Sequence, residues 1–158
     1  MSKNKGLNRT LEWFETAIPE PTAKNQSVQL GCHFEEIAEM LETLSSDDVD
    51  GKAMLHRAFD AVTTVAENLK KDTGYIYLPE ENAVAFLDSL VDQLVTGTGT
   101  GHMYSMDILN ALDEVNRSNW SKFEDGKPVF FENGKLGKGK FYSEPNLVPY
   151  VTLDIFRT

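Results

Sequence analysis

Glutamates recur at helical spacing in residues 34–44, and this acidic cluster is the first feature that suggests chemistry. Projected at about 100° per residue, they fall on one side and the apolar residues on the other. The four are Glu35, Glu36, Glu39 and Glu42. A solvated surface explains such a face in most helices. Here residues 25–51 contain no Lys or Arg, so a divalent cation is the alternative that would relieve the repulsion.

A second acidic pair, Asp88 and Asp92, has a spacing of four residues, so on a helix the two side chains stand one above the other. The pair borders an apolar stripe made of Leu87, Leu90, Val91, Leu94 and Val95. A carboxylate beside a buried face needs a partner, because burying it alone is strongly unfavourable. Residues 72–116 lack Lys and Arg, which leaves a backbone amide, a distant arginine or a metal ion.

Two acidic pairs on two helices, Glu36 with Glu39 and Asp88 with Asp92, offer the hard oxygen ligands that Mg²⁺ prefers, and Mn²⁺ would substitute. Such a site leaves coordination positions for water and phosphate oxygens. Glu35 is adjacent to Glu36 but turned by about 100° on the helix. It is therefore a candidate to accept a proton from an attacking water.

The elements that must position these residues are helices. Hydrophobic spacing predicts them at residues 7–17, about 25–44, 51–71 and 80–103, with a fifth beginning near Asp107. Asp50 is expected to cap the third. After Asn119 the period is lost, and the turn dipeptides Asp125-Gly126 and Asn133-Gly134 predict a short β-hairpin followed by an extended arm. The expected fold is an all-α, four- to five-helix bundle. It forms one domain over residues 1–158, with a helical core at about 7–122 and the hairpin and arm at about 123–158.

The charge distribution restricts the class of partner. A net charge of −10 argues against a nucleic-acid binder, yet 7 of the 15 Lys and Arg residues lie from Arg117 onward. This pattern fits a cation site beside an anion site, or ordinary solvated surface. No apolar run approaches the roughly 20 residues of a membrane span, so no membrane partner is expected. A single cysteine, Cys32, and no apolar secretory segment near Met1 predict a cytoplasmic location.

Four stretches resemble the all-α nucleoside triphosphate pyrophosphohydrolases, which include MazG-like enzymes, dimeric dUTPases and phosphoribosyl-ATP pyrophosphohydrolases. Residues 33–41 (HFEEIAEML) and 88–92 (DSLVD) are similar to the split metal motif of this superfamily. Residues 114–123 (EVNRSNWSKF) and the tail at 134–145 resemble a MazG-like, often phage-encoded subgroup. The resemblance covers most of the chain from Leu11 to about Val151.

By position, the resemblance implies metal ligands at Glu36, Glu39 and Asp92 and a general base at Glu35. It also implies substrate contacts, which are Asn119, Lys122 and, on the tail, Lys138. The wider family has an acid three residues before the final aspartate, where this sequence has Ser89. Asp88 shares a helix face with Asp92, and we expect it to take that role.

The implied reaction is Mg²⁺-dependent hydrolysis of a (deoxy)nucleoside triphosphate to a monophosphate and pyrophosphate, by a homodimer or homotetramer. We expect a slight preference for purine deoxynucleotides such as dGTP. The base would lie between helices near Trp13 or Phe14, although aromatic residues at helical spacing are more typical of a core. Two alternatives are a dUTPase-like hydrolase of dUTP and dUDP and a non-catalytic, acidic helical interaction protein.

Overall fold

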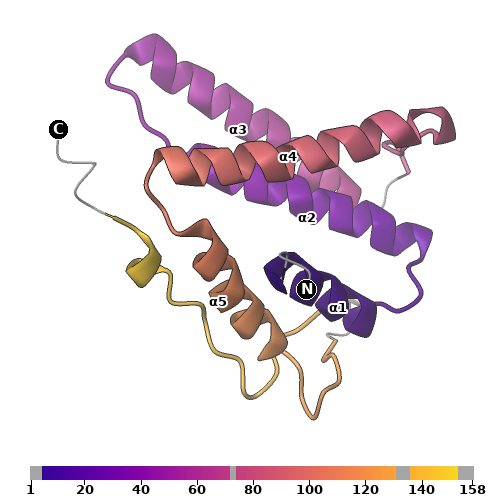
Figure 1. The fold of residues 1–158 in the computed structure, drawn as a ribbon. Coiled ribbons are helices and arrows are strands. Elements are labelled where there is room, and N and C mark those ends of the chain that lie inside the picture. The colour runs from indigo at the N-terminus through magenta and orange to yellow at the C-terminus, as the bar shows by residue number, and fades with distance from the viewer. Residues whose placement is uncertain (1–4, 72–73, 131–135, 153–158) are drawn as a thin grey trace. The chain divides into compact units, whose positions relative to one another are not determined.

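The computed structural model describes residues 5–71, 74–130 and 136–152, and within them the regular structure is helical (Figure 1). The α-helices are α1 (Lys5–Ala17), α2 (Ala23–Glu42), α3 (Val49–Lys70), α4 (Ala83–Met103) and α5 (Ile108–Trp120). Two single 3₁₀ turns are η1 (Glu80–Asn82) and η2 (Val148–Tyr150). The all-α class and all five helices predicted from the sequence are confirmed.

The helix starts follow from side-chain caps. Thr22 begins α2 with a reciprocal capping box, in which its hydroxyl accepts from the Asn25 amide and the Asn25 side chain accepts from the Thr22 amide. The prediction of Asp50 as the cap of α3 is wrong. Asp48 caps the helix, accepting from the Gly51 amide at 2.8 Å, because its backbone is extended whereas Asp50 already lies in the first turn.

The chain divides into two compact units. The first, Pro21–Ala83, contains the helical hairpin formed by α2 and α3 and is called the hairpin unit; it does not include the predicted C-terminal β-hairpin. The arm unit, Met1–Glu20 with Val84–Thr158, contains α1, α5 and nearly all of α4. The expected single bundle domain would join these units and stays a prediction.

In the hairpin unit, α2 and α3 pack side by side through small residues (Figure 1). Gly31, Ala38 and Ala66 are buried at the seam. A Cβ atom on Gly31 would lie 2.8 Å from the Ala66 carbonyl oxygen and 2.7 Å from Cγ of Lys70. The absence of a side chain at Gly31 therefore sets how closely the two helices approach.

In the arm unit, an aromatic core joins α1 to the end of α5. Trp13 and Phe123 stack with centroids 5.8 Å apart, and Phe14 and Trp120 pack around them. Trp13 is only 8% exposed and belongs to this core, whereas a base-binding role near Trp13 or Phe14 stays a prediction.

A buried amide fixes the register between α1 and α5. Asn116, 1% exposed, accepts from the Thr10 hydroxyl and donates to the Gly6 carbonyl. Both ends of its side-chain amide are thus hydrogen-bonded to α1, as a buried polar group requires.

The structure describes only part of the predicted C-terminal β-hairpin. Asp125-Gly126 does form a tight turn with both residues at positive φ, and the amide and carbonyl of Glu124 pair with those of Lys127. The Asn133-Gly134 turn lies outside the described residues. Beside it there is one isolated bridge, Phe130 to Leu136, and the described residues form no strand.

The apolar stripe expected to be buried on α4 is largely exposed. Leu87, Val91, Leu94 and Val95 are each 49–64% exposed, and Val84 is 82% exposed. Apolar faces of this extent usually mark a contact surface. Among the described residues, no helix is long and apolar enough to cross a membrane.

The seam at Gly31 yields a stability prediction. We expect Gly31→Ala to destabilise the protein by about 1–3 kcal/mol, since the added methyl overlaps the α3 backbone. In the matched control, Gly97→Ala on α4, an added Cβ meets no described atom within 4 Å, so this change should stabilise by about 0.5–1 kcal/mol. Urea unfolding measures both, and shifts of the same sign and size would contradict the packing of the seam.

Candidate functional site

The predicted metal ligands are divided between the two units. Glu36 and Glu39 lie on α2 in the hairpin unit, and Asp88 and Asp92 lie on α4 in the arm unit. Among the residues that the structure describes, no three His, Cys, Asp or Glu side chains gather closely enough to hold a metal ion. Each helix contributes a pair, and a site made from both pairs stays a prediction.

The four glutamates of α2 do not share one solvent face. Glu35 lies half-buried over the seam with α3, and its Oε1 pairs with Nζ of Lys70. The prediction that all four point away from the packed side is wrong for this residue. Small residues of α2 allow α3 to approach closely. The side of α2 that packs against α3 therefore includes Gly31, Glu35 and Ala38, and not only the large apolar residues.

Glu36 and Glu39 are exposed on α2, as metal ligands open to substrate should be. No Lys or Arg within the described ranges pairs with Glu39 or Glu42. A cavity of about 220 Å³ opens beside them between α2 and α3. Its acidic lining includes Glu35, Glu39, Glu42 and Glu67, with Lys70 at one end and Phe59 in the wall.

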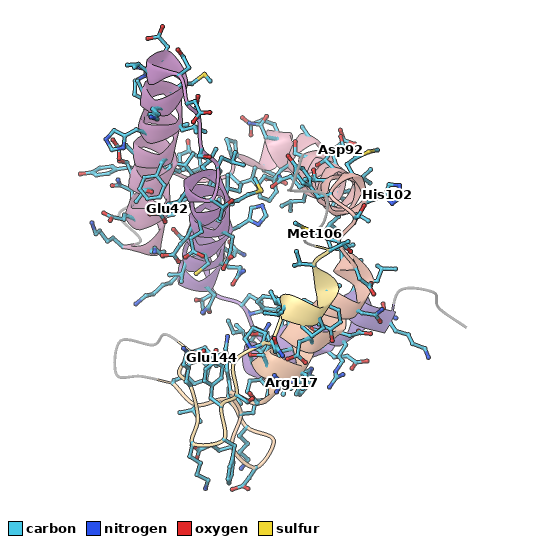
Figure 2. All side chains as sticks on the ribbon, turned by 90° about the vertical axis from the view of Figure 1, so that its left-hand side faces the viewer. Glu42, Asp92, His102, Met106, Arg117 and Glu144 are labelled. Carbon is cyan, nitrogen blue, oxygen red and sulfur yellow. The ribbon has the colours of Figure 1, made fainter. Side chains whose placement is uncertain are left out.

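Asp88 and Asp92 are both exposed on α4 (Figure 2 labels Asp92). The nearby hydroxyl of Thr96 donates to the backbone carbonyl of Asp92 and not to its carboxylate. Neither the backbone amide nor the distant arginine considered for these aspartates is found as a partner among the described residues. The pair is thus two exposed carboxylates one helical turn apart.

The predicted substrate contacts meet at the end of α5. Nζ of Lys122 donates to Oδ1 of Asn119 at 2.8 Å and lies 5.7 Å from the centre of the Trp13 ring. The Trp13 indole in turn donates to the Asn119 carbonyl at 2.9 Å. Lys122 is therefore held beside the aromatic core of the arm unit.

Lys138 lies on the arm that returns past α5. Its Nζ lies 4.4 Å from the centre of the Tyr142 ring and 3.9 Å from a carboxylate oxygen of Glu144. The next residue, Gly139, donates its amide to the Lys122 carbonyl at 3.1 Å. This backbone contact holds the segment that carries Lys138 directly against Lys122.

Two residues that the sequence did not single out, Glu114 and Arg117, fasten the arm to α5. The guanidinium of Arg117 makes two 2.8 Å hydrogen bonds to Glu114 and donates to the Glu144 carbonyl at 2.9 Å (Figure 2). Glu114 also accepts from the Asn146 amide at 2.9 Å. The i,i+3 spacing of an acid and an arginine on a helix is enough to predict this ion pair from the sequence. It does not predict the contacts of the pair with the arm.

This bidentate pair perturbs the carboxyl group. The hydrogen bond from Arg117, followed by that from the Asn146 amide, lowers the pKa of Glu114 from 4.5 to about 2. The ionised form is thus the one that holds the arm.

Comparison of the chain with protein-family models, with curated proteins and with solved structures gives no match. The resemblance to the all-α pyrophosphohydrolases therefore rests on the four similar stretches of sequence, and what it implies about function is a proposal.

The low pKa of Glu114 makes its contribution to stability depend on pH. Because the folded-state value is the lower one, the contribution is complete above about pH 4.5 and is lost as the pH falls toward 2. Arg117→Met should raise the pKa of Glu114 toward 4.5 and loosen the arm near Asn146. Carboxyl titration by NMR in both proteins measures this, and an ordinary Glu114 pKa in the wild type would contradict the assigned pair.

Proposed function

We propose that this protein is a Mg²⁺-dependent nucleoside triphosphate pyrophosphohydrolase, which cleaves between the α- and β-phosphates. The observation that carries the proposal is a pair of carboxylates on each of two helices, in the order of the split metal motif, with the one departure that Asp88 stands four and not three residues before Asp92. Three of these acids, Glu39, Asp88 and Asp92, are exposed and form no ion pair within the described part of the chain. Exposed carboxylates without an ion-pair partner are what we expect of Mg²⁺ ligands when no cation is bound.

In this proposal Glu36, Glu39, Asp88 and Asp92 would hold Mg²⁺, which would orient the triphosphate and neutralise part of its charge. Glu35, one residue from the ligands, accepts the proton of the attacking water. The reaction is NTP + H₂O → NMP + PPi, in which one P–O bond of the α,β-bridge breaks and one forms to the water oxygen.

The basic residues near the end of the chain supply the phosphate contacts in this proposal. Lys122 and Lys138 contact the phosphates as charge-assisted donors, and Asn119 orients Lys122 through the 2.8 Å hydrogen bond. The arrangement accounts for the concentration of basic residues in the last quarter of an acidic chain.

The exposed apolar face of α4 supports an assembled enzyme. We expect a homodimer or homotetramer in which a second copy covers Leu87, Leu94 and their neighbours, since burial of each such side chain contributes about 1.5–3 kcal/mol. Asp88 and Asp92 border this face on the same helix. Assembly would therefore also reduce the water around the predicted ligands and strengthen their electrostatic interactions.

Pyrophosphate release from a panel of deoxy- and ribonucleotides with Mg²⁺ tests the activity. Glu36→Gln and Asp92→Asn should each lower kcat/KM by about 100-fold or more, the effect of losing about 3 kcal/mol of transition-state stabilisation. Glu15→Gln on α1, a matched loss of charge outside the site, should leave turnover unchanged. The proposal fails if the wild type hydrolyses no nucleotide, as the interaction-protein alternative requires.

The same panel identifies the substrate class. We expect purine deoxynucleotides, dGTP among them, to be favoured slightly. Activity confined to dUTP and dUDP would instead identify the dUTPase-like alternative.

Substrate contact by Lys122 is tested separately. Lys122→Met should raise KM by about 10-fold with a smaller change in kcat, because it removes one charge-assisted hydrogen bond of about 1.5–3 kcal/mol. Lys127→Met in the exposed Asp125-Gly126 turn is the matched control and should leave KM unchanged. Equal KM values for the two variants would exclude Lys122 from the phosphate site.

A further inference from the structure

Three contacts along one stripe of α2 fix its register against α3. The Ser27 hydroxyl donates to the Leu69 carbonyl at 2.8 Å, Gly31 lies against Ala66 and Lys70, and Glu35 pairs with Lys70. These α2 positions are spaced by four residues, so they lie on one helix face. Lys70 is thus placed by the same packing that joins the two helices.

The stem of Lys70 has little freedom. Its Cγ lies 2.7 Å from the position of a Cβ on Gly31, so the chain passes through space that any other residue at 31 would fill. The side chain is 27% exposed, against 67% for the neighbouring Lys71, which pairs with Glu67 on its own helix at 3.3 Å. Lys70 is therefore directed across the seam, whereas Lys71 remains an ordinary surface lysine.

The pairing leaves one oxygen of Glu35 available. Lys70 takes Oε1, and no residue in the described part of the chain donates to Oε2. Glu35 also lines the α2–α3 cavity next to Glu39. A glutamate that is anchored through one oxygen and lines a cavity beside a predicted metal ligand can act as an oriented proton acceptor.

We propose that Lys70 is a positioning residue that holds the carboxylate of Glu35 in the orientation needed to accept a proton from water. The inference rests on the proposed pyrophosphohydrolase function, because it assigns a partner to the base of that reaction. Without Lys70 the glutamate side chain regains its rotamers, and only a fraction of them direct Oε2 toward the reacting water.

Steady-state kinetics of the full-length protein with Mg²⁺ and its best nucleotide test the proposal. Lys70→Met should lower kcat by about 10- to 100-fold, the range expected from misplacing a catalytic group, with KM nearly unchanged. Lys70→Arg should recover most of the loss, since it restores a cationic donor. Lys71→Met, which removes an equal charge one residue away, should match the wild type.

A double-mutant cycle shows whether Lys70 acts through Glu35. In a Glu35→Gln background, Lys70→Met should cause no further loss of kcat, because the group that it positions is already absent. A full additional loss would overturn the proposal and show that Lys70 acts directly on the substrate. Equal kcat values for the Lys70→Met and Lys71→Met variants would also overturn it.

The two hypotheses fail in different ways. An inactive wild type overturns the proposed function, and this inference with it, before any variant is made. If the wild type is active and Lys70→Met leaves kcat unchanged, only the role of Lys70 is overturned. Far-UV circular dichroism and thermal melting check folding, and Lys70→Gln replaces Lys70→Met in the same scheme if that variant unfolds.

Discussion

The hairpin unit depends on the close approach of two helix backbones at Gly31. A larger residue there would collide with the Ala66 carbonyl and the Lys70 stem, so the separation and register of α2 and α3 follow from this one position. The register in turn decides which acids face the partner helix. It directs the half-buried Glu35 to Lys70 and leaves Glu36 and Glu39 exposed, so the acids of one helix lie in different surroundings.

The arm unit combines two kinds of attachment. Stacked aromatic rings and the buried Asn116 amide join α1 to α5. These contacts are shielded from water because they are buried inside the unit. The arm itself is fastened by ionised groups at the surface of α5, chiefly Glu114 with Arg117. The part of the arm at Glu144 and Asn146 thus depends on electrostatic contacts. The segment that carries Lys138 is instead held by the Gly139 amide on the Lys122 carbonyl and by Leu136, which packs against the aromatic core.

The helices were predictable because their signal is local: apolar residues recur with the helical period within each segment. The cap of α3 was misplaced by two residues because Asp48 and Asp50 have the same chemistry, and only the extended backbone at Asp48 distinguishes them. The partner of Glu35 was not predictable. It depends on the register of two helices, which composition and periodicity do not specify, and Gly31 reads in sequence only as a weak helix former.

Helix α4 has an unusual composition for a helix that carries predicted ligands. Gly97 and Gly99 lie in its interior with no described atom near a Cβ position, and each weakens a helix by about 1 kcal/mol relative to alanine. Its apolar face is exposed as well. Such a helix gains stability mainly when another surface packs on its apolar face. In the proposed oligomer the helical content of α4 would therefore rise with protein concentration by mass action. Dilution would then weaken the proposed metal site through the loss of helical structure around Asp88 and Asp92, with no change in the proposed ligands themselves.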